Sequence, residues 1–410
     1  MRVCIVTIAG YVHGIGGMQR HTSELARGLV QAGHEVEVIT NRHPDGVSEV
    51  VHEGVLWRFV DVVGDQVDPA WHRASLEAFR AAHAKRPFDV IHSESTCALG
   101  LVRAGVHRDL PLTVKYHGNF LGLAKANARR ALQSPTPLKV AREGKSFLRL
   151  CGQHFPRGNW WRFHGFHSMV PSRQQFDDQR RSHFIPRAKL HVVPNGVDAT
   201  RFTPGDRTAA RAALELGTGP IIVAVGRFNR EKGMHTAVRA LAQLPKPARL
   251  VLVGEGEEQS RLEALAASLG VLDRVVFAGP QPADVVARYL AAADAFVFPT
   301  ERDEGAPMVL VEAMACGVPV VATAIDQIAE VVDGNGENGI LVPLADVDAT
   351  ASALRALIDD PEAAKLIGAR GRERILAEYT LERMVERTVA VYELAIAEHA
   401  GAQNRSGVAA

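Results

Sequence analysis

Short runs of β-branched and apolar residues alternate with Gly-containing turns and helical patterns along almost the whole chain, and this alternation limits the possible folds most strongly. A strand followed by a helix and another strand is typical of a βαβ unit, whose strands pair in parallel. The sequence therefore predicts an α/β fold. The first series of strands is expected at 2–9, 35–41, 55–60, 89–95, 112–118 and 166–172, and the second at 221–226, 248–254, 274–279, 295–300, 319–325 and 339–343.

Each series is long enough for one doubly wound, Rossmann-like domain, and a length of 410 residues suits two such domains. The segment 191–207 between the series is rich in Pro, Gly and Asp, as linkers are. We therefore expect a first domain over 1–195 and a second over 196–378. A last helical pattern, 379–400, is followed by no strand, and we expect it to pack back on the first domain.

Composition excludes several classes of protein. A formal net charge of +1 argues against a dedicated nucleic-acid-binding protein. The four cysteines form no CxxC pair, which argues against a disulfide framework or a zinc ribbon and favours a reducing, cytoplasmic location. The apolar N-terminus is interpreted as a strand rather than a signal peptide, and no apolar run reaches the about 18 residues of a membrane span. Contact with a membrane would then be peripheral, at its inner face.

Two glutamates stand out directly after the strand expected at 295–300. Glu304 precedes a helix start marked by Gly305 and Pro307, and Glu312 lies about two turns inside that helix. The loop amides and the positive helix end favour a phosphate, and a carboxylate beside them accepts hydrogen bonds from sugar hydroxyls. On spacing alone, a surface salt bridge explains the pair equally well.

Two further loops follow strands. GIGGMQRH (14–21) opens a helix and suits an anionic group, although a tight turn that needs glycine explains it as well. Because it is not GxGxxG, a nicotinamide cofactor is disfavoured. Arg227 and Lys232 follow the strand 221–226, where open α/β sheets bind ligands. They suit a diphosphate, and the alternative is a pair of exposed surface cations.

These motifs together resemble the retaining glycosyltransferases of the GT-B fold, in particular glycosyltransferase family 4 (glycosyl transferases group 1). The glutamates resemble that family's Glu–seven residues–Glu signature. Further motifs agree in order: GIGGMQRH (14–21), YHG (116–118), VPNGVD (193–198), VGRFNREKG (225–233) and VGEGEEQSRLEALA (253–266). The resemblance covers essentially 1–400 and implies two facing Rossmann-like domains with an interdomain cleft.

The resemblance also implies site residues. His117, Arg227, Lys232 and Glu304 would be catalytic, with His117 and Glu304 at the transferred sugar and Glu312 at the ribose. The donor would be bound by Gly16, Gly17, Gly226, Arg227, Lys232, Glu304, Gly305, Ala306, Pro307, Met308, Val309 and Glu312. The acceptor side would include His21, His117 and Asn119. For the turn at Asn195 and Gly196, a hinge and a simple turn are equally good interpretations.

The implied reaction moves a hexosyl group from a nucleotide-diphosphate sugar to an acceptor hydroxyl with retention, and UDP is the expected nucleotide because it is frequent in the family. We expect neither cofactor nor metal, because Arg227, Lys232 and the helix end supply positive charge. Two alternatives are a nucleotide-sugar epimerase on the same fold and a non-catalytic nucleotide-sugar-binding protein. Conversion without an acceptor, or binding without turnover, would distinguish them.

The segment 121–165 interrupts the alternation and is strongly basic, with nine Lys or Arg residues against the single acid Glu143. Trp160, Trp161 and Phe163 follow its basic part. It is either a solvated helical face with the tryptophans packed beneath it, or a surface for an anionic acceptor or anionic membrane. The acceptor is thus expected to be a small molecule, a glycan or a lipid-linked group.

Asp346 and Asp348 resemble a metal-binding DxD, but they precede a helix and are better explained as its cap.

Overall fold

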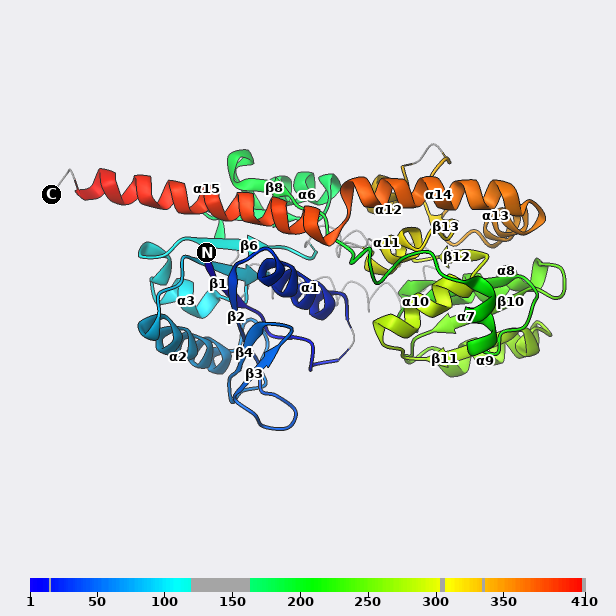
Figure 1. The fold of residues 1–410 in the computed structure, drawn as a ribbon, viewed down its shortest axis with the longest axis horizontal. Coiled ribbons are helices and arrows are strands. Elements are labelled where there is room, and N and C mark those ends of the chain that lie inside the picture. Colours follow the sequence, from blue (N-terminus) through cyan, green and yellow to red (C-terminus); the bar gives the residue numbers. More distant parts are fainter. Residues whose placement is uncertain (15, 119–162, 303–306, 334–335, 408–410) are drawn as a thin grey trace, which may run out of the picture. The chain divides into compact units, whose positions relative to one another are not determined.

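The computed structural model describes residues 1–14, 16–118, 163–302, 307–333 and 336–407 (Figure 1). The chain forms two compact units. Unit 1 contains Met1–Asn195 together with Leu381–Ala410, and unit 2 contains Gly196–Thr380. The C-terminal segment of the chain therefore belongs to the same unit as its N-terminus.

Within its described residues, unit 1 is built on an eight-stranded sheet of order β3-β4-β2-β1-β5-β6-β7-β8, in which only the β3–β4 pair is antiparallel. Its strands are β1 (Arg2–Val6), β2 (Glu35–Thr40), β3 (Glu49–His52), β4 (Val55–Phe59), β5 (Val90–Glu94), β6 (Leu112–Lys115), β7 (His167–Val170) and β8 (Leu190–Val192). Its helices are α1 (Gly17–Gln31), α2 (Pro69–Lys85), α3 (Leu99–Arg103), α6 (Arg173–His183) and α15 (Leu381–Gly407), with the 3₁₀ turns Val106–Arg108 and Arg187–Lys189.

Both faces of this sheet are covered, and for this reason its central strands β1, β5 and β6 are buried at every position rather than at alternate positions. On one face, side chains of α2 and α3 such as Trp71 and Leu99 enter the core. On the other, Leu25 of α1 packs with Leu381 and Tyr392 of α15. The C-terminal helix thus completes the core of unit 1.

Unit 2 contains a parallel sheet with six described strands in the order β11-β10-β9-β12-β13-β14. The strands are β9 (Ile221–Val225), β10 (Arg249–Val253), β11 (Val275–Gly279), β12 (Ala295–Phe298), β13 (Val320–Thr323) and β14 (Ile340–Val342). The helices are α7 (Arg207–Ala213), α8 (Met234–Gln243), α9 (Gln259–Ser268), α10 (Ala283–Ala292), α11 (Met308–Ala315), α12 (Asp326–Val332), α13 (Val347–Asp359) and α14 (Pro361–Glu378), with the 3₁₀ turns Arg230–Lys232 and Leu272–Arg274.

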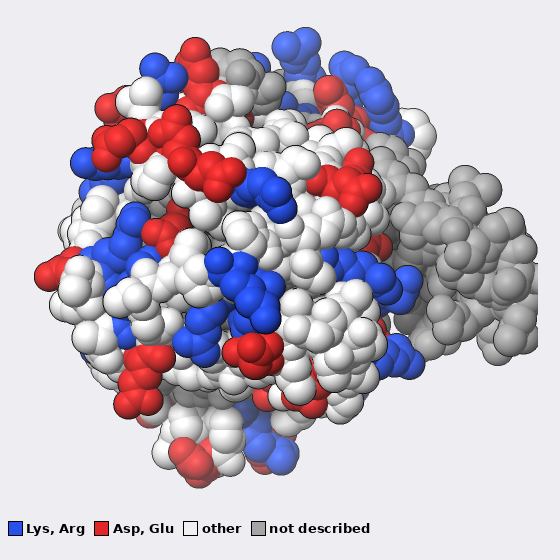
Figure 2. All heavy atoms as spheres, turned by 90° about the vertical axis from the view of Figure 1, so that its right-hand side faces the viewer, with Lys and Arg blue, Asp and Glu red and all other residues white. Residues whose placement is uncertain are grey.

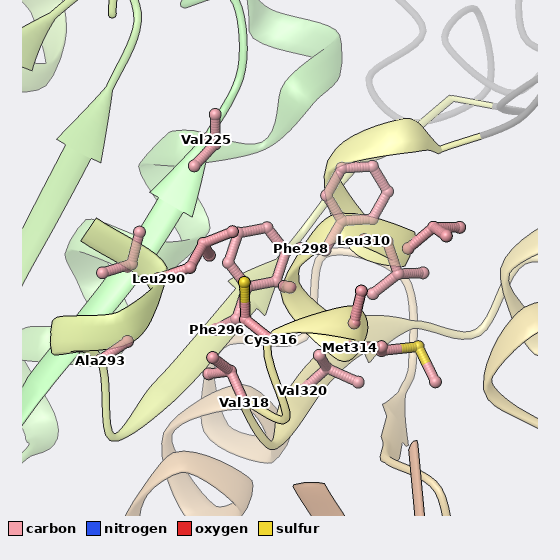
Figure 3. Close-up of a cluster of buried hydrophobic side chains, with 14 of the residues drawn as sticks. Val225, Leu290, Ala293, Phe296, Phe298, Leu310, Met314, Cys316, Val318 and Val320 are labelled. Atoms are coloured by element: carbon pink, nitrogen blue, oxygen red, sulfur yellow. The ribbon is translucent and has the colours of Figure 1, made fainter. Parts of the chain in front are cut away.

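Helix α11 is held against the sheet of unit 2 by a tight apolar cluster (Figure 3). Leu310 and Met314 of α11 lie with Phe296 and Phe298 of β12 and with Val320 of β13, and all five side chains are buried. Burial of such a side chain stabilises a fold by about 1.5–3 kcal/mol. Helix α11 is therefore anchored against β12 and β13.

The structure confirms the predicted fold class of parallel-sheet, doubly wound α/β domains. It also contains two strands, β3 and β8, that the pattern did not predict. Asp346 caps α13, because its side chain accepts a hydrogen bond from the amide of Ala349 at 2.9 Å, as expected for the DxD look-alike. None of the helices in the described residues combines the length and apolar character needed to cross a bilayer.

Candidate active site

Each sheet has one point at which the strand order reverses, and open α/β sheets bind their ligands beyond the carboxyl ends of the strands at such a point. In unit 1 the reversal lies between β1 and β5, and in unit 2 between β9 and β12. The predicted site residues of each unit follow these strands or their immediate neighbours. The two units are described separately.

The loop after β9 in unit 2 carries the predicted diphosphate-binding cations. Gly226 and Arg227 follow the strand directly, and Lys232 ends a 3₁₀ turn, Arg230–Lys232, which the side chain of Asn229 caps through the Lys232 amide at 3.1 Å. The Arg227 side chain is exposed, and it makes no ion pair within the described parts of the chain. The Lys232 Nζ lies 5.8 Å from the centre of the Phe298 ring.

This loop is fixed to the segment after β12. The Glu231 carbonyl accepts hydrogen bonds from the Glu301 amide at 2.7 Å and the Thr300 hydroxyl at 3.2 Å. Gly233 has φ +66°, and a Cβ built there would lie only 1.9 Å from the carbonyl oxygen of Pro299. Only glycine fits this close approach, which brings the two loops at the reversal point of unit 2 together.

Charges of both signs are interspersed over the face of unit 2 seen in Figure 2. Lys and Arg side chains lie there beside Asp and Glu side chains, in keeping with a net charge of +1 for the whole chain. The described residues of this face therefore present no broad region of a single charge sign.

The second glutamate of the predicted signature, Glu312, is 1% exposed in the middle of α11. Pro307 caps this helix, and Met308 and Val309 form its first turn. Glu304, Gly305 and Ala306 lie outside the described residues. Burial, and secondarily the Glu312 carboxylate, raise the pKa of the nearby Cys316 thiol to about 12.

In unit 1, α1 begins at the predicted glycine loop, with Gly16 as its N-cap. Gly16 has extended backbone, and a Cβ there would meet only the flexible side chain of Gln19. Gly17 has open space around it, and among the described residues of this loop Gly14 has left-handed backbone, with φ +102°. A backbone requirement for glycine thus exists at Gly14 and not at the two positions that were predicted to bind the donor.

His117, two residues beyond β6, is joined to a buried carboxylate. Its Nε2 forms a short hydrogen bond with Glu94 Oε2 at the end of β5. Glu94 is fully buried, and its Oε1 accepts a hydrogen bond from the Thr22 hydroxyl at 3.2 Å. His21 of α1 is 1% exposed, and its Nε2 lies 3.7 Å from the same oxygen. The structure thus brings His21 and His117 together, whereas Asn119 lies outside the described residues.

More ionisable groups surround this carboxylate. Burial lowers the pKa of Lys115 to about 7, although Glu94 opposes the shift, and the Lys115 ammonium is hydrogen-bonded to the Val193 carbonyl. Burial lowers the pKa of His21 well below its usual value. Burial alone would raise the pKa of Glu94, but the nearby His117 and His21 hold it well below the usual range. Glu94 is therefore ionised at neutral pH.

His21, Glu94 and His117 are also the described residues that could hold a metal ion, because one ligand atom from each lies within 4.8 Å of the others. Two imidazoles and a carboxylate are a donor set typical of Zn²⁺. The expectation that the reaction needs no metal stays a prediction.

Sequence reasoning missed Glu94 and Lys115. Each is a charged residue that ends a strand whose residues are all buried. Charged side chains are almost never fully buried unless they are paired. A charge at the carboxyl end of a predicted central strand was the signal that would have found them.

Comparisons with known proteins agree with this geometry. The model of "Glycosyltransferase Family 4" matches residues 15–201, and that of "Glycosyl transferases group 1" matches residues 206–374. A D-inositol 3-phosphate glycosyltransferase of Acidothermus cellulolyticus is 30% identical, covering 93% of this chain and 86% of that protein. The chain belongs to glycosyltransferase family 4. It is a glycosyltransferase, and the epimerase and binding-protein alternatives are not favoured.

One solved structure and one further sequence relative are similar to this glycosyltransferase. The sucrose-phosphate synthase of Thermosynechococcus elongatus has a TM-score of 0.78 at 26% identity, covering 97% of this chain and 99% of that one. This similarity confirms the GT-B fold. A GDP-mannose-dependent α-(1-6)-phosphatidylinositol monomannoside mannosyltransferase of Mycolicibacterium smegmatis is 37% identical over 47% of this chain and 53% of that protein.

Proposed function

We propose that this glycosyltransferase moves a hexosyl group from a nucleotide-diphosphate sugar to an acceptor hydroxyl, with retention at the anomeric carbon and without a metal ion. The observation that carries the proposal is the cationic loop after β9, which is fixed to residues 299–301 directly after β12. Such a loop presents positive charge where a diphosphate leaves.

Arg227 and Lys232 would stabilise the leaving nucleotide diphosphate. Arg227 offers a planar fork for phosphate oxygens and Lys232 a point charge. Because the loop is already held by Gly233 and by the Glu231 carbonyl, these charges need little reorganisation during the reaction. Preorganised charges of this kind lower an activation barrier by several kcal/mol.

The sugar and ribose would be bound by the carboxylates. In this proposal Glu312 accepts hydrogen bonds from the ribose hydroxyls, Glu304 contacts the transferred sugar, and residues 305–309 hold phosphate through their amides. His117 of unit 1 contacts the same sugar. Gly16 and Gly17 lie near the donor phosphate, with His21 and Asn119 on the acceptor side.

Retention would follow from attack on the same face of the sugar, with the leaving phosphate taking the proton of the acceptor. The described cysteines are unsuited as nucleophiles: burial raises the pKa of the Cys97 and Cys316 thiols to about 12, and that of Cys4 still further. A thiol must be ionised to act as a nucleophile.

The acceptor would be an alcohol that carries a phosphate group. The names of the relatives support this class, since they include D-inositol 3-phosphate, a phosphatidylinositol monomannoside and sucrose phosphate. The basic segment 121–165, most of which lies outside the described residues, would attract such an acceptor or the anionic membrane that holds it. A cytoplasmic enzyme with peripheral membrane contact fits this proposal.

UDP is our expected nucleotide, and the GDP-mannose-dependent relative makes GDP the main competitor. The test is a thermal-shift panel of UDP-, GDP-, ADP- and TDP-sugars with metals chelated. A ligand at about 100 times its Kd adds roughly 2.7 kcal/mol of stability, a clear rise in Tm. We expect one nucleotide class to shift Tm, and Arg227→Ala to lose that shift. Arg239→Ala, which removes an exposed cation from α8, is the matched control and keeps it.

A turnover assay then distinguishes glycosyl transfer from epimerisation and from binding without catalysis. With the donor identified, release of the nucleotide should depend on an added phosphorylated alcohol such as inositol phosphate. Conversion of the sugar without an acceptor would instead identify an epimerase. Binding with no turnover for any phosphorylated, glycan or lipid acceptor would count against transfer. Replacing Lys139, Arg142, Lys145 and Arg149 with Glu should abolish binding to anionic liposomes, and a wild-type protein that ignores such liposomes would end the membrane proposal.

A further inference from the structure

The nucleotide-binding role proposed for unit 2 does not explain one feature of unit 1 that is unfavourable for its stability. Glu94 is a fully buried, ionised carboxylate at the end of a central strand, and such a group destabilises a fold unless it is well paired. Its partners come from separate elements of the unit. His117 follows β6, Thr22 and His21 belong to α1, and His92 lies on β5 itself.

The contact with His117 fixes which ring nitrogen is engaged. Nε2 of His117 is bonded to Glu94, and Nδ1 makes no hydrogen bond within the described parts of the chain. Because an ionised carboxylate can only accept, Nε2 must carry the proton. Nδ1 then remains for a ligand, on a side chain that is 19% exposed whereas Glu94 is fully buried.

We infer that Glu94 is a positioning residue, which fixes the ring orientation and the Nε2–H form of His117 and so directs Nδ1 toward the sugar. This inference rests on the proposed function of His117. Glu94 itself would not touch the substrate, because it is sealed beneath His117, His21 and Thr22.

The same arrangement links His117 to the C-terminal helix. The Tyr392 hydroxyl of α15 is 2.7 Å from Nδ1 of His92, and Nε2 of His92 is 3.5 Å from Glu94 Oε1. The buried Lys115 adds a cationic group from β6 on the other side. The ionisable groups that face Glu94 are thus His21 from α1, His92 from β5, Lys115 and His117 from and beyond β6, and Tyr392 from α15.

A metal ion is the competing explanation for this cluster. Zinc binds nitrogen and oxygen at about 2.0–2.2 Å in tetrahedral geometry, which keeps its ligand atoms roughly 3.3 Å apart. The short Glu94–His117 hydrogen bond brings two of the three candidate atoms much closer than that. The cluster as built is therefore a hydrogen-bonded pair, and it would have to open before it could hold a metal.

The test is ¹⁵N NMR of the full chain labelled at histidine, with His117 assigned from a His117→Gln variant. In the wild type we expect Nε2 of His117 to carry the proton throughout the neutral range. Glu94→Gln replaces a carboxylate that can only accept with an amide that can also donate, so the preference for the Nε2–H form should be lost and the Nδ1–H form of His117 should appear. Thr22→Val, which leaves the carboxylate in place, is the matched control and should keep His117 in the Nε2–H form.

The spectra are interpretable even without a folded Glu94→Gln protein, because a wild-type His117 protonated on Nδ1 would by itself refute the inference. A His117 that stays entirely in the Nε2–H form in folded Glu94→Gln would do the same. So would uptake of one equivalent of ZnCl₂ with shifts at both His21 and His117. In assays, Glu94→Gln should lower kcat at least 10-fold while nucleotide binding to unit 2 is unchanged. Loss of nucleotide binding in the wild type would refute the proposed function and leave the NMR result standing.

Discussion

Replacing Gly233 with Ala tests whether the cationic loop of unit 2 is as rigid as the structure indicates. The new Cβ would lie 1.9 Å from the Pro299 carbonyl oxygen. The loop after β9 and the segment after β12 would have to separate by roughly 1 Å, since protein interiors are close-packed. The substitution should therefore destabilise unit 2 and displace Arg227 and Lys232 together.

A matched control separates the clash from the backbone strain. Gly270 has φ +68°, close to the +66° of Gly233, but a Cβ there meets nothing within 4 Å. Left-handed backbone costs an alanine about 1–2 kcal/mol, and loss of unfolded-state freedom returns about 0.4–1 kcal/mol. We expect Gly270→Ala to cost about 1 kcal/mol. Gly233→Ala adds an overpacking cost of about 1–3 kcal/mol.

The assay is amide hydrogen exchange of β9, the central strand of unit 2, in both variants. All four tryptophans lie within 1–195, so their fluorescence reports on unit 1 and is unsuitable here. Gly233→Ala should also weaken nucleotide binding by at least tenfold, because misplacing site groups by about 1 Å is costly. Equal destabilisation by the two variants, within about 0.5 kcal/mol, would refute the reasoning.

Three further outcomes follow from the same geometry. Lys115→Met should stabilise unit 1 more at pH 6.5 than at pH 8.5, measured by urea unfolding followed by tryptophan fluorescence. The pKa of Lys115 is about 7 in the folded unit and near its ordinary value in the unfolded chain. Above pH 7 the unfolded wild type therefore binds a proton that the folded unit has lost, and the free energy of unfolding of the wild type rises with pH. A constant difference would contradict the buried ammonium. Tyr392→Phe should lower the free energy of unfolding of unit 1 by about 1–3 kcal/mol in the same assay, because the Nδ1 atom of buried His92 loses its hydrogen-bond partner. An unchanged free energy of unfolding would show that this hydrogen bond is unimportant. Glu312→Gln should weaken nucleotide binding about tenfold in calorimetry, since hydrogen bonds to a charged group are worth about 1.5–3 kcal/mol, and undiminished affinity would exclude a ribose contact.

Much of the fold was predictable because several central strands are buried on both faces and contain short, nearly continuous apolar runs. β1 and β9, for example, are buried at every position and were predicted from their β-branched residues. β3 was missed because its residues, Glu49–His52, are mostly exposed and pair only with one neighbour at the sheet edge. A short edge strand of this kind leaves little apolar pattern in the sequence.

The candidate site was predictable where a motif follows a strand, and not where distant segments meet. Arg227 and Lys232 were found from their place after β9. The pairing of Glu94 with His117 and His21 joins three elements, and no local spacing specifies it. The glycine loop is a local example of the same limit: left-handed backbone lies at Gly14, and the sequence alone does not show which glycine of the loop adopts it.

The return of α15 to unit 1 has a consequence for synthesis on the ribosome. Unit 2 is one continuous stretch, Gly196–Thr380, and all of its core is available before the chain ends. Unit 1 begins the chain but lacks Leu381, Met384 and Tyr392 until the last residues emerge. At roughly 5–20 residues per second it must wait on the order of ten seconds or more with one face of its sheet covered by α1 but not yet by α15. The first unit to be translated is therefore the last to be completed.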